Sequence, residues 1–200
     1  MSVVVAVKGR FELQDYVALA CDRQLTTSNG TRVESDAPKW RQVTIEDAGK
    51  AAALVAMVGT GSALDALDKV LIGGSSILAY NRQLLDWCIA VLVPELRAAH
   101  ERARCFEVRD GQQLFGGDVL VAWRDQFVAV GSDGHVFVPS TDHFAIGSGR
   151  EAALGALSAL SLAVRTEDMT AEDRAWHAVR AATQVDCYCG GEPIMGGTRG

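Results

Sequence analysis

The first part of the chain shows short alternating apolar runs that are typical of β-strands. Residues 3–7 and 16–21 are two such runs, and the second ends at a polar, turn-forming stretch. The two runs are expected to pair as a hairpin. Two more strands are expected over 39–45 and 51–58, separated by the loop residues 46–50.

The pattern changes to a helical period at Ser62, directly after a Gly-Thr-Gly sequence. Leucines spaced three and four residues apart share one face, Ser62 is placed to cap the first turn, and glycines at 73–74 end the helix. A second helix is expected over 77–104. Pro94 lies inside this span and would kink the helix or divide it in two.

Extended runs return in the second half of the chain. The runs at 117–123, 126–131 and 135–139 are expected to form a β-meander, and the Asp-Gly dipeptide at 133–134 is a strong tight-turn signal. A further short strand is expected at 144–146, where the chain runs into a Gly-Ser-Gly sequence.

Two helices and a last extended segment complete the pattern. A stretch rich in Ala and Leu over 151–164 is helical in character, and Thr170 with Asp173 begins the last helix as a capping box. Residues 186–195 are expected to be extended. The order of strands, two helices, strands, two helices and a strand indicates an α+β fold. Two antiparallel sheets would stack, with helices on both outer faces.

Length and composition limit the class of protein. The chain has 200 residues, 48% of them hydrophobic, and is expected to form one domain over residues 1–200. The net charge of −6 is spread without a basic run, which argues against a nucleic-acid partner. The first apolar run is broken by Lys8, and no apolar stretch approaches the roughly 20 residues that span a bilayer. Neither a signal peptide nor a membrane segment is expected.

The cysteines favour a reducing compartment. The chain has five, an odd number without the spacing of a disulfide framework, so a cytoplasmic location is expected. Cys187 and Cys189 form a Cys-x-Cys pair, but no second pair lies nearby to complete four zinc ligands. Structural thiols are therefore favoured over a metal site, and no metal or cofactor is expected.

The N-terminus carries the strongest chemical signal. The phosphate-loop, zinc-protease and nucleophile-elbow motifs are missing from the sequence, and the four histidines are scattered. Ser2 is small enough for methionine aminopeptidase to remove Met1, which would leave a serine with a free α-amine. Because such an amine has a pKa of about 7.7 to 8.0, it can accept the hydroxyl proton as a general base. A Met-Ser start is also common among cytosolic proteins of every kind.

Several segments agree in order and spacing with one known family. Near the start we find S-V-V-V-A-V-K and A-L-A-C-D-R-Q-L-T-T, similar to the family's T-T-I-V-A-V and A-G-D-G-Q-V-T. Further on there are V-A-M-V-G-T-G-S-A-L-D-A, F-A-I-G-S-G-R-E-A-A-L-G-A and D-C-Y-C-G-G-E-P-I. These are similar to F-A-G-x-x-A-D, A-I-G-S-G-x-x-A-x-x-A and D-x-x-S-G-G-x-x-D. Over nearly its full length the chain resembles the proteasome β subunits and the bacterial HslV peptidase.

The resemblance implies an N-terminal-nucleophile hydrolase fold, a four-layer αββα sandwich, with an endopeptidase site. Ser2 takes the position of the family's threonine nucleophile. Lys39 matches the lysine whose cation lowers the pKa of the α-amine, and Asp22 matches the carboxylate that holds this lysine. Ser148 and Asp186 match a serine and a second carboxylate that position protons. Without the family, Lys39 and Asp22 would be interpreted as a surface ion pair.

The resemblance also implies an oxyanion hole and shows three departures from the family. The oxyanion donor is a backbone N–H that the resemblance puts at Ala56 or Met57, and one such donor contributes on the order of 3 kcal/mol to the barrier. Ser2 lacks the methyl group of threonine. Ala56 stands where a glycine is expected, and Cys189 replaces a serine.

Three functions are compatible with these features. The first is a peptidase subunit that self-assembles into stacked rings and cleaves unfolded polypeptides inside the chamber that the rings enclose. Its partner would be an AAA+ unfoldase. The second is a non-catalytic, ring-forming structural subunit, which the departures favour. The third is an N-terminal-nucleophile amidohydrolase that acts on a small amide, since one fold serves several functions. Lys39 at the family's spacing favours the peptidase.

Overall fold

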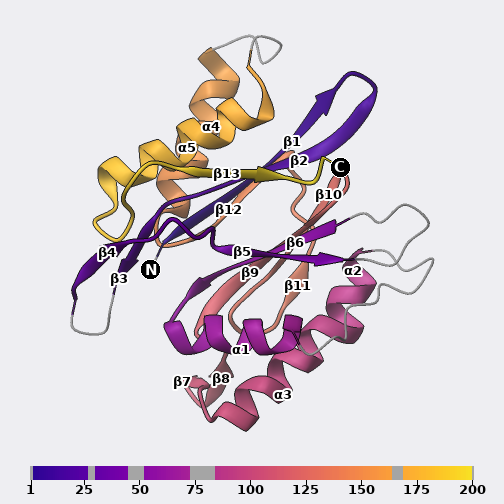
Figure 1. Cartoon of the computed structure of the whole chain (residues 1–200), viewed down its shortest axis with the longest axis vertical. Coiled ribbons are helices and arrows are strands. Elements are labelled where there is room, and N and C mark those ends of the chain that lie inside the picture. The colour runs from indigo at the N-terminus through magenta and orange to yellow at the C-terminus, as the bar shows by residue number, and fades with distance from the viewer. Residues whose placement is uncertain (1, 27–29, 45–51, 73–83, 164–168, 200) are drawn as a thin grey trace.

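A four-stranded antiparallel sheet forms around the predicted N-terminal hairpin (Figure 1). β1 (Val3–Phe11) pairs with β2 (Gln14–Cys21), β12 (His143–Gly147) lies along the other side of β1, and β13 (Ile194–Gly197) lies along β2. The hairpin and the short strand near residue 145 are therefore confirmed. The structure, a computed structural model, describes residues 2–26, 30–44, 52–72, 84–163 and 169–199.

A second antiparallel sheet has five strands in the order β11-β10-β9-β6-β5. Its strands are β5 (Trp40–Thr44), β6 (Ala52–Gly59), β9 (Gly117–Trp123), β10 (Gln126–Val130) and β11 (Val136–Phe137). The last three follow one another as the predicted meander. The first two pair with each other as neighbours in sequence.

Helices from the middle of the chain pack on the five-stranded sheet (Figure 1). The first is α1 (Gly61–Ile72). The second predicted helix is observed as α2 (Leu84–Trp87), a π-helical turn η1 (Cys88–Leu92) and α3 (Val93–Ala103). Pro94 is the second residue of α3 and has no N–H to donate back into the preceding turn, which is π-helical. Trp87, Leu92 and Val93, at the junctions, keep right-handed helical angles, so the helix changes its hydrogen-bond pattern before Pro94 and is not split in two.

Two helices from the C-terminal part pack on the four-stranded sheet. They are α4 (Arg150–Ala163) and α5 (Ala171–Val185). The predicted capping box opens α5, because Thr170 Oγ1 accepts from the Asp173 N–H at 3.0 Å and the Asp173 carboxylate accepts from the Thr170 N–H at 3.2 Å. Alanine at most of the buried positions of α5 lets the helix lie close against β1 and β2.

Three apolar clusters hold these elements together, and β1 takes part in two of them. Val3, Val5 and Val7 face α4 and α5, whereas Val4 and Ala6 face the other sheet. Side chains alternate between the two faces of a strand, so a strand buried on both faces is apolar throughout. The cluster between the sheets also contains side chains of β2, β6 and β9. The third cluster joins the five-stranded sheet to α1, α2 and α3.

Two short hairpins were not expected from the sequence. β3 (Gln24–Thr26) lies in the stretch 22–30 that was expected to be a polar turn, and it pairs with β4 (Arg32–Glu34), where no element was expected. β7 (Glu107–Arg109) pairs with β8 (Gln112–Leu114) around an Asp-Gly dipeptide whose φ angles are 51° and 78°. That dipeptide was an available turn signal, but the strands that flank it have three residues each and are mostly polar and exposed.

Two expectations about element ends were wrong. The segment over 186–195 is not extended throughout, because residues 187–188 form a turn and β13 begins only at Ile194. Ser62 does not cap α1, which begins one residue earlier. Thr60 does so instead, with its Oγ1 accepting from the Ala63 N–H at 3.4 Å. Outside the described residues lie the predicted loop 46–50, the glycines at 73–74, residues 77–83 and residue 164.

None of the helices in the part of the chain that the structure describes is long and apolar enough to cross a membrane. The architecture is mixed α/β with antiparallel sheets, as the order of predicted elements indicated.

Candidate active site

Asp22 and Lys39 form a buried ion pair where two strands of different sheets come together. Asp22 directly follows β2 and is fully buried, and Lys39 directly precedes β5 with its side chain 7% exposed. The Lys39 Nζ lies 2.5 Å from Asp22 Oδ1. The pair is therefore not a surface ion pair. Burying two charges costs several kcal/mol for each ion unless other polar groups also form hydrogen bonds with them.

The backbone supplies those additional partners to Asp22. Its Oδ1 also accepts from the Val3 N–H at 2.9 Å, and its Oδ2 accepts from the N–H groups of Gln24 at 3.1 Å and Gly190 at 3.2 Å. Hydrogen bonds to an ionised carboxylate are stronger than those between neutral groups. The carboxylate thus connects the start of β1, the start of β3 and the segment before β13 to Lys39.

Ser2 lies beside this ion pair, at the start of β1. The residue is buried, and its Oγ donates to the backbone oxygen of Gln24 at 3.3 Å. Lys39 Nζ donates to the same oxygen at 2.9 Å. Two donors converge on one acceptor, so the hydroxyl and the ammonium are close neighbours. Three of the predicted site residues are therefore brought together.

Ser148 and Asp186 approach Ser2 from a different direction. The Ser148 Oγ lies 3.4 Å from the Ser2 carbonyl oxygen and also hydrogen bonds to the Asp186 carboxylate. Partial burial would raise the pKa of Asp186, but hydrogen bonds from Ser148, the Tyr188 N–H and the Cys189 thiol hold it below its ordinary value. The remaining two predicted residues thus belong to the same group of contacts.

The turn after β12 requires glycine because it touches the backbone of Ser2. Gly147 has a φ of +98°, a value that residues with a Cβ rarely adopt. A Cβ built there would lie 2.1 Å from the Ser2 oxygen. The close approach lets Ser148 and the Gly149 N–H, at 3.5 Å, reach that oxygen.

Cys189 occupies the position where the resemblance has serine, and its thiol is used as a donor. It is buried, and its Sγ lies 3.3 Å from Asp186 Oδ2. Burial raises the pKa of this thiol, so it keeps its proton near neutral pH. Cys187, by contrast, is exposed. Among the described residues, no three His, Cys, Asp or Glu side chains are grouped in a way that could hold a metal.

Ala56 and Met57 were expected to supply the oxyanion donor, and the structure argues against both. They lie within β6, which is paired with β5 on one side and β9 on the other. The Met57 N–H already donates to the Lys39 carbonyl oxygen at 3.2 Å, and both residues are fully buried. Gly61, exposed at the N-terminus of α1, is the better candidate, because the first N–H groups of a helix lack intrahelical partners and side chains of α1 line a pocket together with Lys39.

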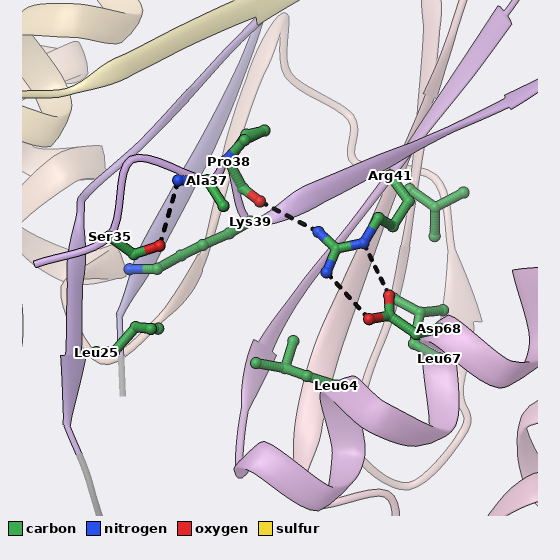
Figure 2. Close-up of a pocket in the computed structure, with 10 residues that line it drawn as sticks. Leu25, Ser35, Ala37, Pro38, Lys39, Arg41, Leu64, Leu67 and Asp68 are labelled. Carbon is green, nitrogen blue, oxygen red and sulfur yellow. Dashed lines mark hydrogen bonds and ion pairs between the residues drawn. The ribbon is translucent and has the colours of Figure 1, made fainter.

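A pocket opens next to Lys39, as Figure 2 shows. Its volume is about 140 Å³. The side chains of Leu64, Leu67 and Asp68 come from α1, and Arg41 comes from β5. The rest of the lining is supplied by Leu25, Ser35, Ala37, Pro38, Lys39 and Val55. The pocket is mainly apolar, with one visible ion pair between Arg41 and Asp68 (Figure 2).

Gln24 is a site residue that the sequence did not indicate. Its backbone N–H and C=O contact Asp22, Ser2 and Lys39, and a backbone contact leaves no signal in the residue type. Its side chain is nearly buried, and Nε2 donates to the Cys187 carbonyl at 3.1 Å and to Thr26 Oγ1 at 3.3 Å. A glutamine in an otherwise polar turn gave no reason to expect this.

Comparison of whole chains identifies the fold. The sequence matches no family model and none of the curated proteins. The structure matches BPH from Thiobacillus denitrificans with a TM-score of 0.73 and 21% identity, over 98% of this chain and 96% of that one. It matches HslV from Trypanosoma brucei with a TM-score of 0.61 and 22% identity, over 98% of both chains. The chain has the proteasome/HslV-type fold.

A third structure with this proteasome-type fold is Anbu from Yersinia bercovieri. It matches with a TM-score of 0.67 and 12% identity, over 98% of this chain and 81% of that one. In the proteasome-type fold of this chain, the start of β1, the end of β2 and the start of β5 converge, which is why Ser2, Asp22 and Lys39 meet.

Proposed function

We propose that this chain is an endopeptidase subunit in which Ser2, exposed by removal of Met1, is the nucleophile. The observation that carries the proposal is the convergence of the Ser2 hydroxyl and the Lys39 ammonium on the Gln24 carbonyl, beside the buried carboxylate of Asp22. A cation held close to a hydroxyl and an α-amine favours loss of a proton from each. The oriented pair therefore suits an N-terminal nucleophile.

The reaction needs only peptide and water. The Ser2 Oγ bonds to the scissile carbonyl carbon while its proton passes to the α-amine, an ordinary base of pKa about 7.7 to 8.0. The C–N bond then breaks, and the α-ammonium returns the proton to the leaving amine. Water attacks the resulting ester with the α-amine as base. The ester C–O bond breaks, which releases the acid and restores Ser2.

The other contacts position these groups. Asp22 keeps Lys39 in place, and Ser148 with Asp186 orients the backbone of Ser2.

The Gly61 N–H is the oxyanion donor in this proposal, and it takes the role first expected of Ala56 or Met57. One donor of this kind is worth on the order of 3 kcal/mol in the barrier.

The proposal includes the assembly and the layered fold. The single domain is a four-layer αββα sandwich, an arrangement supported by the three apolar clusters between the helices and the two sheets. Cytoplasmic subunits self-assemble into stacked rings that enclose the sites, and an AAA+ unfoldase supplies unfolded polypeptide. Extended substrate binds along a strand edge beside the nucleophile.

The proposal is tested by the intact mass of the protein before and after incubation with epoxomicin, the molecule bound in a structure of T. denitrificans BPH. We expect an adduct on chains that lack Met1 and none on Ser2→Ala. The matched control is Ser158→Ala, because Ser158 is an exposed serine in the third turn of α4 and does not belong to the group of site contacts. This variant should react like the unmodified sequence.

Native mass spectrometry separates the remaining possibilities. Absence of an adduct on fully processed chains in rings would contradict the peptidase and leave a non-catalytic ring subunit. A processed monomer that hydrolyses small amides but not peptides would support the small-amide hydrolase.

A further inference from the structure

We propose that the Arg41–Asp68 ion pair sets the cleavage preference of this site, so that the residue before the scissile bond is an uncharged apolar one of medium size. The inference rests on the proposed peptidase function. It concerns the pocket beside Lys39, where a side chain next to the attacked carbonyl would lie.

The pocket is adjacent to the nucleophile through two residues. Lys39 lines the pocket, and its Nζ shares the Gln24 carbonyl with the Ser2 hydroxyl. Leu25, which follows Gln24 in β3, lines the pocket from the same side. A carbonyl held at Ser2 therefore has its neighbouring side chain beside Lys39 and Leu25.

Arg41 is held in place by Asp68 and by two carbonyls. Its Nε lies 2.9 Å from Asp68 Oδ1, and its Nη2 donates to Asp68 Oδ2 at 3.0 Å. Its Nη1 donates to the carbonyl oxygens of Pro38 and Trp40, each at 3.3 Å. Two parallel hydrogen bonds fix the guanidinium plane on the carboxylate. Figure 2 shows this pair on the α1 side of the pocket.

The pairing leaves the pocket without a net charge. The two cations that line it are Lys39, which is paired with Asp22, and Arg41, which is paired with Asp68. The rest of the wall is largely aliphatic. A charged substrate side chain entering this pocket would lose water without finding an unpaired counter-ion, which is unfavourable. An uncharged apolar side chain has no bound water of hydration to lose and needs no counter-ion.

The size of the pocket suits a side chain such as leucine or phenylalanine. Its volume is about 140 Å³. For comparison, an apolar cavity of about 150 Å³ in a protein accommodates benzene. Leu64 and Leu67, one turn apart on α1, give it an apolar wall.

The experiment measures kcat/KM for three peptides that differ only in the residue before the scissile bond, leucine, glutamate or lysine. The unmodified site should prefer leucine by at least about tenfold, a difference that corresponds to about 1.4 kcal/mol. Asp68→Asn leaves Arg41 without its counter-ion, so the glutamate peptide should gain about five- to tenfold relative to the leucine peptide. Arg41→Gln leaves Asp68 unpaired, so the lysine peptide should gain instead.

Two controls make the result specific. The double variant Arg41→Gln/Asp68→Asn removes both charges and should restore the preference for leucine. Asp15→Asn breaks a different ion pair, the exposed pair with Arg10 at 3.2 Å in the β1–β2 hairpin, and should change no preference. The gains should shrink as salt is raised, because Arg41 and Asp68 are partly exposed to solvent.

The outcomes distinguish this inference from the function on which it rests. Ser2-dependent cleavage with the same order of preference in both single variants would overturn the role of the Arg41–Asp68 pair and leave the peptidase intact. If no peptide is cleaved and epoxomicin forms no adduct, the peptidase and this inference fall together.

Discussion

Ser2 and Lys39 donate to one acceptor, since the Ser2 hydroxyl and the Lys39 ammonium both hydrogen bond to the Gln24 carbonyl oxygen, at 3.3 and 2.9 Å. The acceptor belongs to the backbone, so no side-chain substitution can delete it. Its position, however, depends on how firmly the residue that carries it is fixed. The Gln24 side chain fixes it through its bonds to Cys187 and Thr26.

Gln24→Leu should reduce kcat about tenfold, which is about 1.4 kcal/mol in the barrier, with little change in KM. The substitution keeps the side chain buried but removes the hydrogen bond to the Cys187 carbonyl. Steady-state kinetics, on the peptide with leucine before the scissile bond, measures kcat and KM separately. Thr26→Val is the matched control, because it removes only the weaker contact at 3.3 Å. An effect on KM alone would contradict a positioning role for Gln24.

Lys39→Met should lower the free energy of unfolding by about 3 to 5 kcal/mol, because it leaves the buried Asp22 carboxylate without its counter-ion. Adding Asp22→Asn to this variant should recover part of the loss, since the uncompensated charge is then gone. Urea unfolding of the single and double variants measures both effects. A double variant less stable than Lys39→Met would show that the charge is not the cause.

Gly147→Ala should abolish activity and destabilise the protein, whereas Gly155→Ala should not. At Gly147 the added Cβ meets the Ser2 carbonyl at 2.1 Å and the φ is +98°. At Gly155, inside α4, the Cβ has nothing within 4 Å, and alanine in a helix is favoured over glycine by about 0.5 to 1 kcal/mol. Thermal unfolding and epoxomicin adduct formation test the pair. Equal effects at both sites would refute the close-contact argument.

The stability that Asp186 contributes should depend on pH in one direction. Its pKa is lower in the folded chain than the ordinary value of about 3.9, so its contribution is fully present above that value. It is lost as the pH falls through the folded pKa. The gap in unfolding free energy between the unmodified chain and Asp186→Asn should therefore be constant near neutral pH and close in acid. A gap that stays constant into the acid range would contradict this prediction.

The sequence was sufficient to predict those elements whose residue pattern is set by burial on two faces or by strong local signals. The valines of β1, the meander around β9 and the capping box of α5 belong to this class. The five site side chains were expected from the resemblance, and the structure brings them into one group of contacts. Their chemical roles stay predictions.

Other features left no signal in the residue types. Each strand of the β3–β4 hairpin has three residues and a single apolar one, Leu25 or Val33, so neither strand is long enough to show an alternating pattern in the sequence. The Gln24 carbonyl acts through the backbone, which any residue supplies. The structure argues against the expected donors at Ala56 and Met57, because β6 is paired with a strand on each side and the Met57 N–H already has a partner. The sequence of one segment does not show which strands will pair with it.

Gly190 donates to Asp22 across 168 positions of the chain. Asp22 in turn accepts from the Val3 N–H, next to Ser2, so the geometry around Ser2 depends on residues made long after it. While the ribosome is still synthesising the last part of the chain, Ser2 and Asp22 have already left the exit tunnel, but the Asp22 carboxylate still lacks the Gly190 N–H. A nascent chain therefore cannot complete this set of contacts until Gly190 has emerged, so the proposed peptidase would be inactive throughout its own synthesis.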